Sequence, residues 1–350
     1  MLAVRWHGPR DVRVEEVEEP GPPGPGMVAL AVSLCGICGT DLAEYLHGPV
    51  LIRDRPHPLS GQRPPVVLGH ELVGTVEAVG PGVEGVRLGQ RVVVDACWRC
   101  GRCWFCVRGD YHLCPQGGSV GLHSDGGLAP RVQVPAYTLV PLPEGVPDPE
   151  AALTEPLAVA VHACDQGGIG LGETAAVVGF GPVGACVALC ARAAGARVVV
   201  LEPLAGRREV AARLGFEEVL DPSDADPRRE VRRRTGGLGA DVAFDCTGNP
   251  ELLPSSLELT RRGGTLVVAG LGKAPGRLDP NRLVLFERRV VGSLGYRHDL
   301  PRALELLAWG RVRARELVTG TVPLEEAVRE GFEALARDPG RHLKVQVRCS

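Results

Sequence analysis

Lysine is almost absent from this chain, which contains only Lys273 and Lys344, so nearly all of its basic side chains are arginines. Asparagine occurs only at positions 249 and 281, methionine occurs twice, and aromatic residues make up 4% of the 350 residues. Few Asn and Met residues, with Arg in place of Lys, are compatible with adaptation to heat. A GC-rich genome gives the same arginine excess, so the composition alone does not decide between these origins.

The chain also lacks a strong net charge and a long apolar run. Its formal net charge is −3, and the Arg-rich stretch 228–234 includes Glu and no aromatic residue, which is typical of a solvated helix face. The first ten residues include Arg, His and Pro, so they do not form the apolar region of a secretory signal. Gly and Pro interrupt the most apolar run, 175–191, which is shorter than the roughly 20 residues of a spanning helix. We therefore expect a cytoplasmic protein that binds neither nucleic acid nor membranes.

The pattern of apolar residues predicts two domains. The first part of the chain alternates short β-type runs with Gly and Pro turns. From about Glu155, apolar strands alternate with helical segments, which predicts a parallel sheet with helices on both faces. After Val291 the pattern returns to a helix and a final strand. We predict an α/β protein with a β-rich domain, 1–154 and 297–350, and a doubly wound domain, 155–296, inserted between its halves.

A glycine-rich loop, G-F-G-P-V-G at 179–184, follows an apolar strand and opens a helix. Such glycines permit a tight turn and close approach to a pyrophosphate, which the helix N-terminus favours. Glu202 ends the next strand, where a carboxylate accepts from the ribose hydroxyls and repels a 2′-phosphate. We predict NAD rather than NADP, although Arg207 and Arg208 soften this exclusion. The predicted cofactor-binding residues are Gly179, Gly181, Pro182, Val183, Gly184, Glu202 and Arg207.

Cysteines are clustered at C-x2-C-x2-C-x7-C, from Cys100 through Cys103 and Cys106 to Cys114. Four sulfurs at this spacing converge on one tetrahedral Zn²⁺. Reducing surroundings disfavour disulfides, and four exposed free thiols would be reactive. A four-sulfur shell leaves no position for a substrate, so this zinc is expected to be structural. Cys97 offers a second register in place of Cys114, and the spacing leaves the fourth ligand open.

A second set of metal-binding side chains lies upstream. Cys38, in G-I-C-G-T-D, and His70, in G-H-E, both follow apolar runs that bring them to strand ends beside a cleft. Thiolate and imidazole are good zinc ligands, and Glu71 adds a carboxylate. Asp41 and Glu44 also form a capping box, so this segment is equally typical of a helix start.

Taken together and in this order, these motifs resemble the zinc-containing medium-chain alcohol dehydrogenase family across nearly the whole chain. The resemblance implies a GroES-like catalytic domain with a structural zinc lobe at 97–114, and a Rossmann domain that binds NAD. It implies two zinc ions per chain. The structural zinc is assigned to Cys100, Cys103, Cys106 and Cys114, which decides against Cys97.

The same resemblance implies roles for the upstream set. Cys38 and His70 match ligands of a catalytic zinc, and Glu71 and Glu155 match carboxylates that complete its shell or exchange with water. Thr40 matches the hydroxyl that takes the substrate proton, and Asp41 matches the partner of the ligating histidine. The sequence departs from the family at Ala43, where a proton-relay histidine is common. We expect His47, His57 or water to carry the proton instead, with water slightly favoured.

The substrate is also predicted from the resemblance. Segments 44–71 and 155–163 are most similar to the (R,R)-2,3-butanediol dehydrogenases, whereas sorbitol and threonine dehydrogenases usually lack the Pro-rich insertion at 47–65. This implies NAD-linked interconversion of a secondary alcohol or vicinal diol and its ketone, 2,3-butanediol and acetoin, by a homotetramer or homodimer. The alternatives are an L-threonine or sorbitol dehydrogenase and, outside the enzymes, a redox sensor that binds zinc and NADH.

Overall fold

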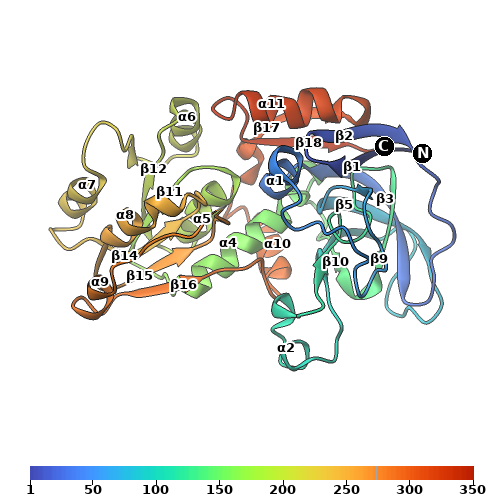
Figure 1. Ribbon diagram of the computed structural model, residues 1–350, viewed down its shortest axis with the longest axis horizontal. Coiled ribbons are helices and arrows are strands. Elements are labelled where there is room, and N and C mark those ends of the chain that lie inside the picture. Colours follow the sequence, from blue (N-terminus) through green and yellow to red (C-terminus); the bar gives the residue numbers. More distant parts are fainter. Residues whose placement is uncertain (273) are drawn as a thin grey trace. The chain divides into compact units, whose positions relative to one another are not determined.

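The structure, a computed structural model, describes residues 1–272 and 274–350, so Lys273 lies outside the described residues (Figure 1). By its internal contacts the chain divides into two compact units. The first comprises Met1–Glu155, Ala303–Ala308 and Val318–Ser350, and the second comprises Pro156–Arg302 and Trp309–Leu317. The second unit is therefore inserted into the first along the sequence, while the domain boundaries given above stay predictions.

The first unit is rich in β-structure, and its described residues form two larger sheets. A three-stranded sheet has the order β2-β1-β4, and a seven-stranded sheet has the order β10-β6-β5-β3-β18-β17 with β9 also paired to β3. The strands of the small sheet are β1 (Leu2–Gly8), β2 (Asp11–Glu16) and β4 (Val66–Val67). Those of the large sheet are β3 (Met27–Gly36), β5 (Glu71–Val79), β6 (Arg91–Val94), β9 (Arg131–Pro135), β10 (Leu139–Pro141), β17 (Val318–Pro323) and β18 (Lys344–Arg348).

Strand β3 brings distant parts of the sequence together at Gly36. This residue lies opposite Glu71 on β5 and opposite Gln346 on β18. A Cβ atom on Gly36 would lie 2.2 Å from Oε2 of Glu71, so only glycine leaves room for that carboxylate. The register therefore places the C-terminal strand and the start of β5 beside one buried point of the sheet.

Short helices and one small ribbon complete the first unit. The ribbon pairs β7 (Cys97–Trp98) with β8 (Gly118–Ser119). The helices are α1 (Gly39–His47), α2 (Trp104–Val107), α3 (Asp148–Ala151) and α11 (Glu333–Arg337).

In the second unit the described residues form a six-stranded parallel sheet with the order β13-β12-β11-β14-β15-β16. The strand order reverses between β11 and β14, and ligands of open α/β sheets bind outside the strand ends at such a point. The strands are β11 (Thr174–Val178), β12 (Arg197–Leu201), β13 (Val219–Leu220), β14 (Ala240–Asp245), β15 (Thr260–Val268) and β16 (Arg289–Gly292).

Helices follow the strands of this sheet, and α5 and α8 pack against its central strands. The helices are α4 (Thr154–Gly167), α5 (Pro182–Ala193), α6 (Ala205–Arg213), α7 (Pro227–Arg234), α8 (Leu253–Glu258), α9 (Pro280–Val284) and α10 (Leu300–Ala308), and α4 and α10 extend into the first unit. No helix of the described residues has both the length and the apolar character that crossing a membrane requires.

The loop after α1 is held by one buried carboxylate, that of Glu44. This side chain is fully buried, and its oxygens accept hydrogen bonds from the backbone N–H groups of Val50, Leu51 and Ile52. The backbone oxygen of Glu44 accepts a hydrogen bond from the indole of Trp6 at 3.0 Å. Because hydrogen bonds to an ionised acceptor are stronger than neutral ones, Glu44 fixes the start of the Pro-rich segment against α1.

We expect the isosteric substitution Glu44→Gln to lower the free energy of unfolding by about 1–3 kcal/mol, because an amide NH2 replaces one acceptor oxygen and leaves a backbone donor unpaired. Urea unfolding followed by circular dichroism measures the change. Glu84→Gln, at an exposed position, serves as the matched control. Equal midpoints for Glu44→Gln and the wild-type chain would contradict this role.

Candidate functional site

Cys38, His70 and Glu71 come together in the first unit. Cys38 is the residue before helix α1, and His70 and Glu71 stand at the start of β5. One ligand atom from each lies within 4.8 Å of the other two. His70 is 5% exposed and Glu71 is fully buried, so the thiol, the imidazole and the carboxylate meet in the interior of the unit.

Asp41 sets the orientation of both Cys38 and His70. One oxygen of Asp41 accepts the backbone N–H of Cys38 at 3.0 Å, and the other lies 3.5 Å from Nδ1 of His70. Burial disfavours an imidazolium here, but Asp41 and Cys38 outweigh burial and raise the pKa of His70 well above its usual range, so the surroundings of this ring favour a positive charge. With Nδ1 turned to a carboxylate, the other ring nitrogen is the one available to a metal ion, and the donor set of sulfur, nitrogen and oxygen fits zinc.

Glu71 is engaged by the chain's only described lysine. Nζ of Lys344 lies 2.6 and 2.7 Å from the two oxygens of Glu71, and it also donates to the backbone oxygen of Ile37 at 3.2 Å. Lys344 is 1% exposed. Both oxygens of the carboxylate that the sequence suggests as a zinc ligand therefore contact an ammonium group, and a metal ion would compete with Lys344 for them.

Glu155, at the start of α4, belongs to the same electrostatic environment. Burial raises the pKa of Glu155 to about 7, and Glu71 adds to this effect, whereas His70 and Lys344 oppose it. The Thr40 hydroxyl lies 3.7 Å from the Cys38 sulfur. The structure thus places a second carboxylate and a hydroxyl near the candidate metal ligands.

The cysteine lobe has the geometry of a four-sulfur zinc site. The ligand atoms of Cys100, Cys103, Cys106 and Cys114 lie within 4.8 Å of one another, a group to which Cys97 does not belong. Two sulfur pairs, Cys100 with Cys106 and Cys103 with Cys114, are each 3.9 Å apart. With Zn–S bonds of about 2.3 Å, the edge of a ZnS4 tetrahedron is about 3.8 Å. The four sulfurs therefore fit one zinc ion closely.

Arg99 anchors this lobe to the rest of the first unit. Its guanidinium lies 4.0 Å from the ring centre of Tyr111 and 4.5 Å from that of Tyr137. It also pairs with Asp95 at 3.0 Å. Two cation–π contacts and an ion pair on the residue before Cys100 restrict how the lobe moves.

In the second unit, the loop 179–184 joins β11 to helix α5. Gly179 has a φ of 86°, which favours glycine, and a Cβ on Gly184 would lie 1.9 Å from the backbone oxygen of Gly179. Pro182 is at the first position of α5, where its missing N–H costs no helical hydrogen bond. The backbone therefore adopts a tight strand-to-helix turn that presents the N-terminus of α5 to a phosphate group.

Glu202, just past the end of β12, contacts this loop directly. Its side chain accepts hydrogen bonds from the N–H groups of Phe180 at 2.6 Å and Leu204 at 2.9 Å. Arg207 lies 3.9 Å from the same carboxylate, whereas Arg208 pairs with Asp221 at 2.7 Å. Of the two arginines that could favour NADP, Arg208 is therefore already paired with a different carboxylate, that of Asp221.

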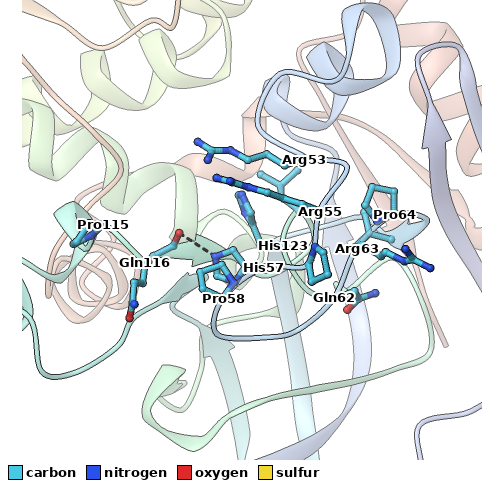
Figure 2. Close-up of a pocket in the computed structure, with 14 residues that line it drawn as sticks. Arg53, Arg55, His57, Pro58, Gln62, Arg63, Pro64, Pro115, Gln116 and His123 are labelled. Carbon is cyan, nitrogen blue, oxygen red and sulfur yellow. Dashed lines mark hydrogen bonds between the residues drawn. The ribbon is translucent and has the colours of Figure 1, made fainter.

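The candidates for proton exit differ in their surroundings. His47 is exposed at the end of α1. Nε2 of His57 lies 3.1 Å from the backbone oxygen of Gly117, and Nδ1 accepts from the N–H groups of Leu59 and Ser60 at 3.4 Å (Figure 2). Both ring nitrogens of His57 are therefore engaged with backbone groups, which leaves His57 less suited than water or His47 to pass on a proton.

Lys344 is the residue at this site that sequence reasoning does not assign. One feature of the sequence points to it: Lys344 is a lysine in the last strand of a chain in which nearly all basic side chains are arginines. An ammonium group is compact, and the space beside Gly36 and Ile37 is fully buried.

We expect Lys344→Met to lower the free energy of unfolding of the first unit by about 3–5 kcal/mol, because it leaves the buried Glu71 carboxylate without its partner. The double variant Lys344→Met/Glu71→Gln recovers part of this loss, since it also removes the charge. Arg348→Met, at the exposed end of the same strand, is the control. Thermal and urea unfolding measure the effect, and a Lys344→Met chain as stable as the control would refute it.

A pH dependence is expected from His123, whose ring centre is 4.9 Å from that of His57. Burial, His57 and Arg53 lower the pKa of His123 from 6.5 to about 4. The unfolded chain therefore binds a proton that the folded chain does not bind between these values, so folding stability falls as the pH drops from 6.5 toward 4.

The variant His123→Gln lacks this titration, so its free energy of unfolding should depend less steeply on pH in that window. Urea unfolding at a series of pH values measures the slope. His47→Gln replaces a second imidazole of the same unit and is the matched control. Identical slopes for His123→Gln and the wild-type chain would exclude the assignment.

Comparison with known proteins places these features in a family. Residues 24–144 match the alcohol dehydrogenase GroES-like domain, and residues 182–309 match the zinc-binding dehydrogenase domain. The chain is 39% identical to the (R,R)-butanediol dehydrogenase of Bacillus subtilis over 99% of each chain. It is 35% identical to human sorbitol dehydrogenase, over 98% of this chain and 94% of that one.

Solved structures give the same result. The crystal structure of 2R,3R-butanediol dehydrogenase from Bacillus subtilis superposes with a TM-score of 0.92 at 38% identity, over 99% of each chain. A zinc-binding dehydrogenase from Sinorhizobium meliloti bound to NADP has a TM-score of 0.89 at 32% identity, over 99% of this chain and 98% of that one. An alcohol dehydrogenase from Escherichia coli in complex with NADH has a TM-score of 0.89 at 26% identity, over 99% of each chain. The predicted family and the predicted fold class, a GroES-like domain with a Rossmann domain, are confirmed: this chain belongs to the zinc-binding alcohol dehydrogenases.

Proposed function

We propose that this chain is an NAD-linked dehydrogenase that interconverts 2,3-butanediol and acetoin. The observation that carries the proposal is the similarity to butanediol dehydrogenases of three organisms, at 34–39% identity over 90–99% of each chain. The site is consistent with it, because Cys38 and His70 are close enough to share one metal ion, Thr40 lies beside Cys38, and the charge of His70 acts on Glu155. A vicinal diol is small and uncharged, and it requires one hydroxyl to lose a proton and one carbon to lose a hydride.

We assign the reactive zinc to Cys38, His70 and Glu155. These residues would hold a zinc ion whose Lewis acidity would lower the pKa of a nearby hydroxyl group. Glu71 is the less suitable third ligand, because both of its oxygens contact Lys344. Glu155 makes no comparable ion pair with any described residue, so its carboxylate is available to the metal. Cys100, Cys103, Cys106 and Cys114 hold the second, structural zinc.

Protein side chains orient the substrate and move its proton. The Thr40 hydroxyl, beside the Cys38 sulfur, is placed to accept the proton of the substrate hydroxyl and pass it toward solvent. Asp41 keeps the Cys38 backbone and the His70 ring in position through its two carboxylate oxygens. The loop residues Gly179, Gly181, Pro182, Val183 and Gly184 would hold NAD, which would supply the hydride acceptor. Glu202 favours NAD over NADP because a carboxylate repels a 2′-phosphate, and Arg207 is its nearest cation.

The proposal extends to the state of the chain in the cell. We place it in the cytoplasm, where its unpaired thiols stay reduced. We also propose an oligomer of identical chains, a tetramer or a dimer. Support for association comes from apolar side chains of the second unit that face solvent, including Val284 at 74%, Leu285 at 69% and Leu294 at 52% exposure.

Sorbitol is the second candidate substrate, since sorbitol dehydrogenases of Bacillus subtilis and human are 32% and 35% identical to this chain. Initial rates of NADH formation by the zinc-replete protein with (R,R)-2,3-butanediol, meso-butanediol, sorbitol and L-threonine separate the candidates. We expect the highest kcat/KM for (R,R)-2,3-butanediol, with NAD⁺ preferred to NADP⁺. A preference for sorbitol or threonine would replace the substrate, and no turnover of any of the four would contradict the proposal.

The same assay tests Thr40. We expect Thr40→Val to lower kcat by about 10²-fold or more, the usual contribution of a positioned proton acceptor, while zinc content and NADH binding stay unchanged. Thr321→Val, at an exposed position of β17, is the matched control. Wild-type turnover by Thr40→Val would exclude Thr40 from the proton path.

A further inference from the structure

A cavity of about 130 Å³ in the first unit is not accounted for by the proposed reaction (Figure 2). Two segments line it, the Pro-rich stretch 53–66 and the stretch 115–123 that includes β8. Its volume accommodates several water molecules or one small anion. Three arginines, Arg53, Arg55 and Arg63, belong to its lining, and no aspartate or glutamate is among the described residues that form it.

The wall of this cavity is fixed by hydrogen bonds. Ser60 donates its hydroxyl to the backbone oxygen of His123, and Nδ1 of His123 accepts the N–H of Ser119 at 3.1 Å. Gln62 and Asp125 exchange two hydrogen bonds, of 2.6 and 2.8 Å. Because Nδ1 of His123 acts as an acceptor, this ring is held in one neutral tautomer. The histidines thus shape the wall, and the positive charge of the cavity comes from the arginines.

Arg53 and Arg55 are two positions apart on the first of these segments, and both line the cavity. Both are exposed, and neither forms an ion pair with any described residue, although Asp54 stands between them in sequence. In Figure 2 their side chains extend to the same side of the cavity, next to His123, whereas Arg63 points the opposite way. Two unpaired guanidinium groups on one side of a preformed cavity create a local positive potential that an anion would neutralise.

We propose that this cavity binds a small oxyanion, either inorganic phosphate or the phosphate group of an organic phosphomonoester, between the guanidinium groups of Arg53 and Arg55. The planar fork of arginine suits two-point recognition of such a group. None of the candidate metal ligands, nor Thr40, is among the residues that line this cavity, and an uncharged diol offers its arginines nothing to pair with, so the proposal does not rest on the proposed reaction. Binding would link the segment that Glu44 holds to the segment that carries β8.

Calorimetric titration of the full-length, zinc-replete chain with inorganic phosphate tests the proposal, at constant ionic strength and with NADH present to occupy the loop 179–184. We expect saturable binding of one phosphate per chain. The double variant Arg53→Gln/Arg55→Gln weakens this binding about tenfold or more, because two charge-assisted contacts are lost. A parallel titration with glycerol 3-phosphate identifies the source, since tighter binding than that of phosphate points to an organic phosphate.

Arg63→Gln is the matched control, because it removes one charge from the same segment on a side chain that points away from the other two (Figure 2). Melting curves in phosphate-free buffer establish that each variant is folded. Absence of saturable phosphate binding, or equal binding by the wild-type chain and the double variant, would overturn the proposal. An equal loss in Arg63→Gln and in the single variants Arg53→Gln and Arg55→Gln would also overturn it, because net charge rather than a two-arginine site would then explain the binding.

Discussion

The buried ion pair between Lys344 and Glu71 is the interaction on which the candidate catalytic site depends most. It joins the C-terminal strand to the residue that follows His70, across nearly the whole length of the sequence. Removing either charge alone leaves the other buried without a partner. The pair also limits the freedom of Glu71 beside the candidate metal ligands. Stability of the sheet and selection of the zinc ligands are therefore coupled through one ammonium group.

Local spacing predicted much of the site. Four cysteines within fifteen residues must lie close together, and the structure brings them to the edge lengths of a zinc tetrahedron. The glycine-rich loop is equally predictable from the sequence, because the tight turn itself requires Gly179 and Gly184. The spacing of apolar residues predicts a β-rich domain and a doubly wound domain. The family comparison confirms this fold class.

Contacts between segments that are distant in the sequence could not be predicted from local patterns. The pairing of Lys344 with Glu71 depends on the register of β18, β3 and β5, which no local pattern specifies. The sequence pattern indicates a helix cap at Glu44, whereas the Glu44 carboxylate accepts hydrogen bonds from the following loop. The proximity of Glu155 to His70 was available only from the family resemblance. The ion pair of Arg208 with Asp221 likewise becomes visible only in the fold, because nothing in the sequence around either residue indicates it.

The two-zinc assignment is tested most directly by the zinc content of the purified chain and of its Cys38→Ser variant, measured by mass spectrometry together with turnover of (R,R)-2,3-butanediol. We expect two zinc ions in the wild-type chain and one in the variant, which loses turnover while its cysteine lobe keeps its zinc ion. One zinc ion in the wild-type chain, or two zinc ions and full turnover in the variant, would contradict the assignment of a reactive zinc to Cys38, His70 and Glu155.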